Sequence, residues 1–416
     1  MFTRLRQPLV IFGLVHAILF LLVFSLLSDN YGAGLLERFF ALKILDGQVP
    51  YIDFATEYPP LALLSFLLPA LVWRTPLAYT RVFAVEMLVL DLLALALIAV
   101  LANRLKLPVS KTLTMYTLFV AAMGPIMVSR YDLLPAVLVL AALYTCITGK
   151  NKSAWALLAL GFAAKLYPII IAPFFALYCL RRRQYARLIA GSATFLGVTL
   201  ILILPWLVLD ARSLLSFLSY HAERGLHSES TYGSILLVGQ LLNLTRVQAG
   251  LTFGSWNLMS PLADKLATVS IYITAALLLI IYAGYGRWLW RQPNRVVEVG
   301  ALGNESAWIL LGYSSLAILA FLLANKVFSP QYLIWLCPLL PLVIAERHYW
   351  LWVLFALSGV VTQFIYPYHY IEFEMGQPYV VVLLFGRNLL LIILTVLTIF
   401  LLGIIPAPGK LAKSKQ

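Results

Sequence analysis

Long apolar segments recur along the whole chain and are separated by short polar ones. The hydrocarbon core of a bilayer is roughly 30 Å thick, so a spanning helix needs about 20 apolar residues in a row. In lipid a helix satisfies its own backbone polar groups, which makes it the structure that such runs favour. About twelve membrane spans are therefore expected, over residues 9–27, 82–101, 112–128, 132–148, 154–166, 168–180, 188–209, 266–286, 307–324, 332–345, 349–366 and 378–404.

One further apolar segment, residues 61–73, is too short to belong to this set and follows two consecutive prolines. Segments of this length more often lie at the membrane interface than cross it, so a juxtamembrane helix is expected here. The predicted fold class is therefore an all-α integral membrane protein. It forms one polytopic domain over residues 1–416, with both termini on the same side.

Two long polar segments, residues 28–81 and 210–265, lie on the side opposite the termini in this arrangement. The second contains an amphipathic pattern over 214–221 that suits a helix lying on the membrane surface. The connections on the other side are all short. Because loops held by a rigid scaffold often carry binding and catalysis, function is predicted on the face of the two long loops.

The charges orient the chain. Most of its 30 Lys and Arg residues fall near the termini or in the short connections, whereas most of its 17 Asp and Glu residues fall in the long loops. By the positive-inside rule both termini are cytoplasmic, and the protein is a multi-pass protein of the plasma membrane. The net charge of +13 therefore reflects orientation against anionic lipid, and no nucleic-acid partner is expected.

The first long loop has its most polar and turn-rich stretch at residues 47–61. Asp53 and Glu57 are four residues apart and would share one face of a helical turn. Such a pair can bind sugar hydroxyls, hold a divalent cation, or divide acid and base roles, and the alternative is a turn whose acids cap backbone amides. Asp29, directly after the first expected span, is a candidate general base or a solvated helix end.

Three basic residues are expected at the same level of the membrane as these acids. Arg130 stands two residues before Asp132, so the two could pair, or Arg130 could clamp a phosphate with its planar fork. Lys165 and Lys326 each stand beside a helix that proline interrupts, and together they suggest a phosphate site. Snorkelling of each lysine towards the interface is the alternative.

Other polar residues are weaker candidates. His221 and Arg224 belong to a polar stretch at 220–230, which could also be a solvated loop. Glu86 and Asp91 lie inside the second expected span on different helix faces, where structural hydrogen bonds are favoured. The three cysteines lie in apolar runs without metal-site spacing. No cofactor is expected, although a divalent cation at the loop carboxylates stays open.

Several motifs follow one another in a distinctive order. They are G-x-x-PY-x-DF-x-x-EYPPL from Gly47, RYD from Arg130, K-x-YP from Lys165, YH-x-x-RG-x-x-x-ES from Tyr220 and K-x-x-SPQY from Lys326. Over residues 28–345 this order resembles the GT-C superfamily of polytopic glycosyltransferases, in particular the polyprenol-phosphate-mannose-dependent mannosyltransferase-like family.

The resemblance implies an enzyme that moves a hexose, mannose in that family, from a polyprenyl-phosphate donor. The acceptor would be a lipid-linked or cell-envelope molecule on the extracytoplasmic face. Asp29 would be the base, with Asp53 and Glu57 in reserve, and the basic residues would compensate the donor phosphate. The expected substrate-binding residues are Asp53, Glu57, Tyr58, Arg130, Asp132, Lys165, Tyr167, His221, Arg224, Lys326, Gln331 and Tyr332.

A transporter or flippase for a lipid-linked saccharide is the competing hypothesis. It would need the same basic residues but no base. Many transporters show inverted sequence halves, which this chain lacks, and the long outer loops also favour the enzyme.

Overall fold

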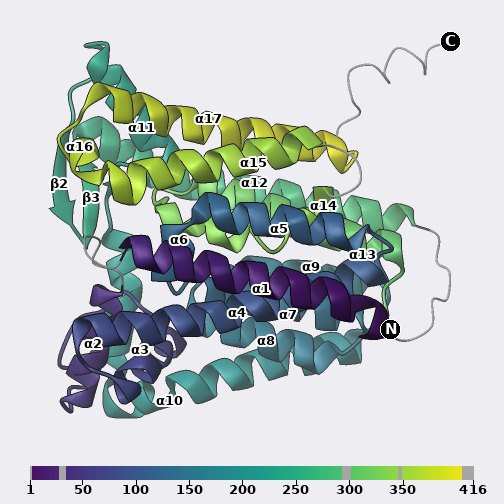
Figure 1. Cartoon of the computed structure of the whole chain (residues 1–416). Helices are drawn as coiled ribbons and strands as arrows, with labels where there is room; N and C mark the ends of the chain where they lie inside the picture. The colour runs from purple at the N-terminus through teal and green to yellow at the C-terminus, as the bar shows by residue number, and fades with distance from the viewer. Residues whose placement is uncertain (1, 28–33, 293–300, 345–348, 405–416) are drawn as a thin grey trace, which may run out of the picture.

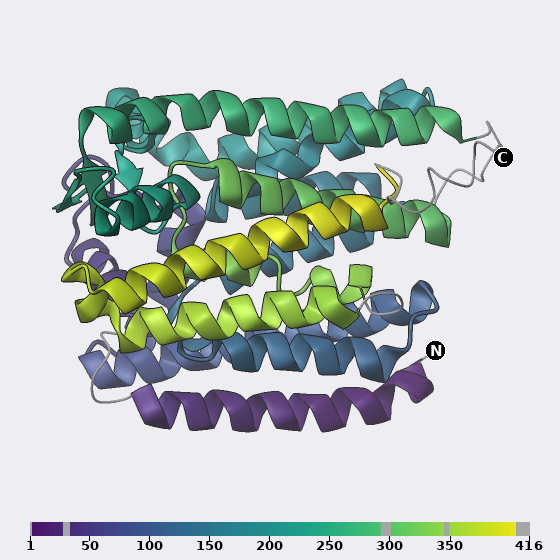
Figure 2. The ribbon, with the colours of Figure 1, turned by 90° about the horizontal axis from the view of Figure 1, so that it is seen from above.

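The protein is a bundle of helices that run side by side, with a cap of shorter elements at one end (Figures 1 and 2). A computed structural model describes residues 2–27, 34–292, 301–344 and 349–404. The elements along the bundle are α1 (Phe2–Leu27), α4 (Pro76–Arg104), α5 (Val109–Met123), α6 (Pro125–Ser129), α7 (Leu133–Ile147), α8 (Asn151–Ala164), the short 3-10 helix η1 (Tyr167–Ile171), α9 (Ala172–Arg181), α10 (Tyr185–Glu223), α12 (Pro261–Arg291), α13 (Asn304–Ala324), the 3-10 helix η2 (Pro330–Trp335), α14 (Leu340–Ile344), α15 (Tyr349–Gln363) and α17 (Pro378–Leu401).

The described part of the chain contains seven helices that are long and apolar enough to cross a membrane: α1, α4, α10, α12, α13, a helix that includes α15, and α17. Shorter apolar helices, among them α5, α7 and the η1–α9 segment, lie between them. In α13 the most apolar window is 83% buried, so this helix lies at the centre of the bundle. In α10 only 6% of the most apolar window is buried, so most of its apolar side chains face outward, as in a helix that faces lipid.

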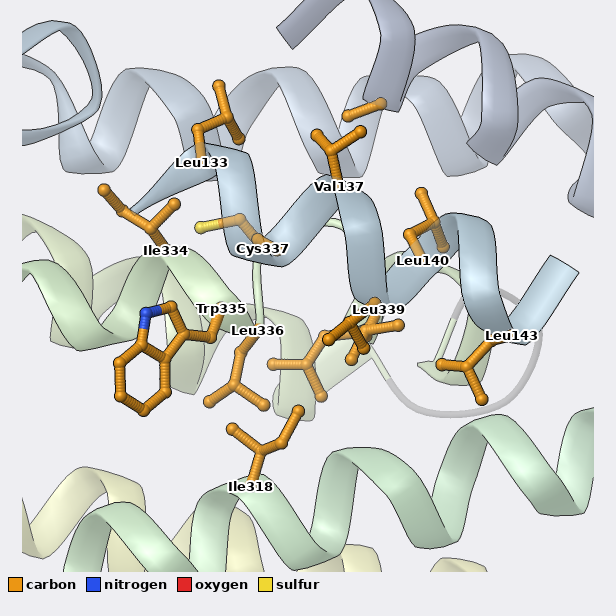
Figure 3. Close-up of a cluster of buried hydrophobic side chains, with 14 of the residues drawn as sticks. Leu133, Val137, Leu140, Leu143, Ile318, Ile334, Trp335, Leu336, Cys337 and Leu339 are labelled. Atoms are coloured by element: carbon orange, nitrogen blue, oxygen red, sulfur yellow. The ribbon is translucent and has the colours of Figure 1, made fainter. Parts of the chain in front are cut away.

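The centre of the bundle is packed by α7, α13 and the η2–α14 segment (Figure 3). On α7, Leu133, Val137, Leu140 and Leu143 recur at helical spacing on one face and are all buried or nearly so. They face Ile334–Leu339, a stretch that also contacts Ile318 of α13. The short, irregular segment after α13 is therefore as deeply buried as the regular helices around it.

Two polar pairs inside the bundle are structural, as the sequence indicated. The Tyr116 hydroxyl donates a hydrogen bond of 2.7 Å to Asp91, and the His16 ring lies 2.5 Å from the same carboxylate. On another face of α4, the Ser65 hydroxyl donates a hydrogen bond of 2.6 Å to Glu86. Each acid thus has its own partner, which offsets the cost of burying it.

The cap consists of short helices and a small sheet gathered at the end of the bundle away from the start of α1 and the end of α17 (Figure 1). Its elements are α2 (Leu35–Leu45), α3 (Pro60–Val72), β1 (Leu226–His227), α11 (Thr231–Leu241), β2 (Gln248–Thr252), β3 (Ser255–Met259), the π-helical turn η3 (Phe364–Tyr368) and α16 (Tyr370–Glu374). The helix expected at 61–73 is therefore present as α3.

The three-stranded antiparallel sheet, with strand order β1-β3-β2, was not expected from the sequence. Strands β2 and β3 form a hairpin whose turn places Phe253 and Gly254 at positive φ, a conformation that glycine favours. β2 is mostly exposed on both faces, so the alternation that marks a half-buried strand is missing. The Trp256 indole donates a hydrogen bond of 2.5 Å to Glu374 and so ties the hairpin to α16.

The amphipathic segment expected at 214–221 belongs to the last part of α10. The backbone of α10 departs from helical geometry at Asp210, where φ is −160°, and the helix then continues to Glu223. This kink carries the chain from the bundle into the cap.

Candidate active site

A cavity of about 480 Å³ lies where the cap meets the bundle. Its walls come from six separate parts of the chain: the first loop, the turn after α6, η1, the second loop with its hairpin, the segment around η2, and the segment around η3. The polar and aromatic side chains that line it are Glu57, Tyr58, Arg130, Tyr131, Lys165, Tyr167, Arg224, His227, Glu229, Ser255, Asn325, Lys326, Ser329, Gln331, Tyr332, Trp335, Tyr366 and Tyr370.

Lys165 enters the cavity because α8 ends just before it. The residue itself is extended, with φ −160°, and Pro168 then starts the 3-10 turn of η1. Its ammonium lies 2.5 Å from a carboxylate oxygen of Asp132 and within about 5 Å of the ring centres of Tyr131 and Tyr332. Lys165 therefore already has an anionic partner.

Asp132 is the buried anchor of this pair. The same carboxylate oxygen that faces Lys165 also accepts a hydrogen bond of 2.7 Å from the Trp335 indole, so three distant segments meet there. Asp132 itself is fully buried behind the cavity wall. The local pair with Arg130, one of the two alternatives from the sequence, does not form.

Arg130 is held by two other groups. It donates a hydrogen bond to the Tyr366 hydroxyl, and its guanidinium lies 3.9 Å from a carboxylate oxygen of Glu37. Glu37 is buried in α2, and burial raises its pKa although Arg130 lowers it in part. Arg130 thus lines the cavity with Glu37 as its nearest acid, and the Nε atom of Arg130 and both carboxyl oxygens of Glu37 have no hydrogen-bond partner within the described residues.

Glu57 is the acid of the first loop that lines the cavity. Burial raises its pKa, while Arg224 nearby and a hydrogen bond donated by the Tyr220 hydroxyl lower it in part. The loop has no helical turn between Asp53 and Glu57, so the two do not share a helix face. Asp53 is exposed and accepts a hydrogen bond of 2.6 Å from the Val49 amide, so it caps a turn.

Arg224 and Lys326 form the second group of cations at the cavity. The Nε atom of Arg224 is buried and has no hydrogen-bond partner within the described ranges. Lys326 is 7% exposed, and burial together with the nearby positive charge of Arg224 lowers its pKa. Two like charges held close together in a partly buried cavity favour the binding of an anion.

Glu229 and His227 also line the cavity, on the segment between α10 and α11. Burial raises the pKa of Glu229 to about 7, against the lowering effects of Arg387 and of a hydrogen bond from the Tyr370 hydroxyl. The Arg387 guanidinium donates a hydrogen bond of 2.9 Å to the Glu229 carbonyl. A residue inside α17 thereby fixes the backbone of this wall.

The cavity gathers most of the residues that the sequence singled out, namely Glu57, Tyr58, Arg130, Lys165, Tyr167, Arg224, Lys326, Gln331 and Tyr332. Asp132 lies directly behind it, and Asp53 is not among its lining residues. Asp29 lies outside the described residues, and the same holds for the side chain of His221. No group of three or more His, Cys, Asp or Glu suited to a metal ion occurs in the described part of the chain.

Sequence reasoning missed several residues of the site: Glu37, Tyr131, His227, Glu229, Trp335, Tyr366 and Tyr370. Glu229 and His227 stood within a motif that drew attention to their neighbours instead. Tyr366 and Tyr370 lie in a segment that was expected to be a plain span and its end. A proline-containing, tyrosine-rich interruption of an apolar run was the available signal.

Comparison with known proteins gives a family match. The model of glycosyltransferase family 87 matches residues 56–318. No curated protein matches the chain. Among solved structures, the chain is similar to the apo form of the Archaeoglobus fulgidus oligosaccharyltransferase, with 13% identity and a TM-score of 0.40. The match covers 96% of this chain and 55% of that one, so the chain spans about half the length of that protein.

Proposed function

Because the chain belongs to glycosyltransferase family 87, we propose that it moves a hexose, and specifically mannose, from a polyprenyl-phosphate donor to a lipid-linked or cell-envelope acceptor. The reaction takes place in the cavity between the bundle and the cap. The observation that carries the proposal is that two cations, Arg224 and Lys326, lie near each other in the cavity wall, close to the carboxylate of Glu57.

Arg224 and Lys326 hold the donor phosphate in this proposal. Lys165 contacts Asp132 at 2.5 Å, so its positive charge is largely offset, and Arg130 lies 3.9 Å from Glu37. When the bond between C1 of the sugar and the phosphate oxygen breaks, negative charge grows on the phosphate. Fixed cations at that position stabilise the transition state more than the ground state. Arg130 and Lys165 shape the wall around the sugar and add a weaker long-range attraction.

A carboxylate of the first loop acts as the base. It takes the proton of the acceptor hydroxyl while that oxygen attacks C1 from the side opposite the phosphate, which inverts the anomeric centre. Asp29 is the first candidate from the sequence. Glu57 is the carboxylate of this loop that lines the cavity, and burial raises its pKa, which makes it a stronger base than an ordinary carboxylate. Asp53, which caps a turn, is the third candidate.

The proposed topology has about twelve spans, with both termini in the cytoplasm and the chain in the plasma membrane. The shorter apolar helices, such as α5 and α7, then cross together with the seven long ones. The basic residues at the end of the bundle where α1 begins and α17 ends support this orientation. The cavity opens on the extracytoplasmic face, where a lipid-borne donor presents its head group.

The test is transfer of label from polyprenyl-phosphate-[14C]mannose to lipid extract by the purified protein. The wild type is compared with Asp29→Asn, Glu57→Gln and Asp53→Asn, and the exposed Asp264 provides the control Asp264→Asn. Loss of a general base costs roughly 10²–10⁴-fold in rate. One of the three loop variants should show such a loss while the control does not.

Retained transfer in all three loop variants would overturn the proposed mechanism. The wild type could instead transfer no label but move the labelled lipid between the leaflets of proteoliposomes. That result would contradict the proposed donor and reaction and favour the transporter hypothesis.

A further inference from the structure

The side chain of His227 is held at the cavity wall by bonds to both neighbouring segments. β1 pairs with β3 so that His227 faces Asn257, and the His227 amide donates a hydrogen bond of 3.0 Å to the Lys326 carbonyl. The ring Nδ1 lies 3.0 Å from the Phe328 carbonyl. His227 is only 2% exposed, and yet it lines the cavity.

These contacts define the tautomer of the ring. A carbonyl oxygen only accepts, so Nδ1 must carry the hydrogen, and in the neutral ring Nε2 is then an acceptor. The charged groups around the ring are three basic residues, Arg224, Lys326 and Arg387, and one acid, Glu229. Burial, and after it Arg224, lower the pKa of His227 to about 3, so the ring is neutral at physiological pH.

Nε2 is left with an unused lone pair. It makes no hydrogen bond within the described residues, and it is not among the fully buried polar atoms without a partner. Because the ring is buried except where it meets the cavity, the exposed part of the ring is turned to the cavity. An acceptor in such a place is satisfied only when a donor group enters.

We propose that His227 is a substrate-binding residue whose Nε2 accepts a hydrogen bond from a sugar hydroxyl next to the phosphate-binding pair Arg224 and Lys326. This inference rests on the proposed function. An ionised phosphate has no hydrogen to donate, and the neighbouring cations repel an ammonium group. A neutral hydroxyl is therefore the ligand that fits Nε2, and it belongs either to the donor hexose or to a sugar acceptor.

The position of His227 is fixed by packing as well as by hydrogen bonds. A Cβ at Gly233 would lie 2.4 Å from the His227 carbonyl oxygen, so the first turn of α11 presses directly on this backbone. The Asn388 amide donates to Ser234 at 2.9 Å, and Arg387 holds the Glu229 carbonyl. An acceptor that is fixed before the substrate arrives adds affinity without a further ordering cost.

Two substitutions separate the structural role of the ring from its role towards substrate. In His227→Asn the side-chain NH2 can keep the hydrogen bond to Phe328, while the distal acceptor is lost. In His227→Gln the amide oxygen can replace the distal acceptor, while the bond to Phe328 is lost. The Asn and Gln amides are the nearest matches to the two ring nitrogens.

The first measurement is binding of polyprenyl phosphate and of polyprenyl-phosphate mannose to the purified protein. If the donor hexose is the ligand, the wild type binds the mannosylated lipid more tightly, and His227→Asn loses about tenfold of that advantage. Binding of the bare lipid phosphate stays unchanged. If an acceptor sugar is the ligand, the loss appears in the KM for the acceptor instead. In either case the ratio of the variant's affinity or KM to that of the wild type is constant between pH 5.5 and 8, because the ring is neutral throughout.

The inference is overturned if His227→Asn matches the wild type in both measurements, or if only His227→Gln is impaired, since the ring would then serve the bond to Phe328 alone. Failure of the proposed function looks different: the wild type would then transfer no mannose, whatever residue stands at position 227.

Discussion

At the scale of single residues, the cations of the site differ in their nearest charged neighbours. Lys165 lies against Asp132, and Arg130 lies between Tyr366 and Glu37. Arg224 and Lys326 instead lie near each other, and burial disfavours the charge of Lys326. A buried cation with its own carboxylate mainly holds the structure together, whereas two adjacent cations in a cavity favour an incoming anion.

The pair of Asp132 and Lys165 gives a prediction about stability. Asp132→Asn leaves the Lys165 ammonium without its carboxylate, and removal of one partner of a buried pair costs about 3 kcal/mol in the free energy of unfolding. Unfolding in mixed micelles with increasing SDS measures this. Asp46→Asn, at an exposed position after α2, is the control and should change little. Unchanged unfolding of Asp132→Asn would show that the pair contributes nothing net.

Glu229 gives a prediction about pH. Its pKa is raised to about 7 in the folded protein from an ordinary value of 4.5, so the folded state keeps a proton that the unfolded state has lost. The contribution of Glu229 to the free energy of unfolding is therefore fully present below about pH 4.5. It falls as pH rises towards 7, by up to about 1.4 kcal/mol per pH unit. Glu229→Gln removes this fall.

The difference between Glu229→Gln and the wild type in unfolding free energy should consequently grow in favour of the variant between pH 5 and pH 8. Glu305→Gln, at an exposed site near the start of α13, should run parallel to the wild type. If the plot of unfolding free energy against pH for Glu229→Gln also runs parallel to that of the wild type, the pKa of Glu229 is not raised.

At the scale of elements, the cap depends on close backbone contact between α11 and the segment that carries His227. Gly233 permits this contact because a Cβ there would lie 2.4 Å from the His227 oxygen and 2.6 Å from the Ser228 oxygen. The Ser230 hydroxyl caps α11 by accepting a hydrogen bond of 3.0 Å from the Gly233 amide. This joint positions a wall of the cavity.

Gly233→Ala should therefore destabilise the protein by about 1–3 kcal/mol, because the new methyl group must displace backbone rather than a flexible side chain. Thermal unfolding measures the effect. Gly386→Ala in α17 is the matched control, since nothing lies within 4 Å of a Cβ there and alanine favours the helix. If the two variants unfold at the same temperature, the contact at Gly233 is looser than described.

The helices could be predicted from the sequence because their signal is local. An apolar run is visible without knowledge of its neighbours, and most of the expected runs form helices, whereas the described residues of 332–345 form the end of η2, a turn and the short α14. The hairpin could not be predicted, since β2 is mostly exposed and lacks alternation. The partner of Asp132 was also hidden: Arg130 is its neighbour in sequence, but Lys165 lies 33 residues away and reaches it only in the folded bundle.

At the scale of the whole molecule, the bundle separates two ends with different chemistry. α1 begins and α17 ends at one end, whereas the cavity and the cap lie at the other (Figures 1 and 2). The sequence predicted this separation from the distribution of charge along the chain. It could not predict which of the outer residues converge, because six distant segments build the cavity.

Cysteine labelling tests the orientation. The native Cys179 and Cys337 are buried and Cys146 is partly buried, so little labelling of the native cysteines is expected. Leu244→Cys, at a 76% exposed position in the cap, should react with a membrane-impermeant maleimide in intact cells. Lys152→Cys, at the opposite end, should react only after permeabilisation. The reverse pattern would place the cavity in the cytoplasm and contradict the proposed topology.

We propose that the cavity binds the phosphate of a lipid-linked sugar through Arg224 and Lys326. The most direct measurement is kcat/KM for hexose transfer by Arg224→Gln and Lys326→Gln, beside Lys326→Arg and the exposed control Lys265→Gln. Each neutral variant should lose roughly 10²–10³-fold, as removal of one group that stabilises developing charge does, while Lys326→Arg and the control keep most activity. Wild-type kcat/KM in both neutral variants would show that Arg224 and Lys326 do not bind the donor phosphate.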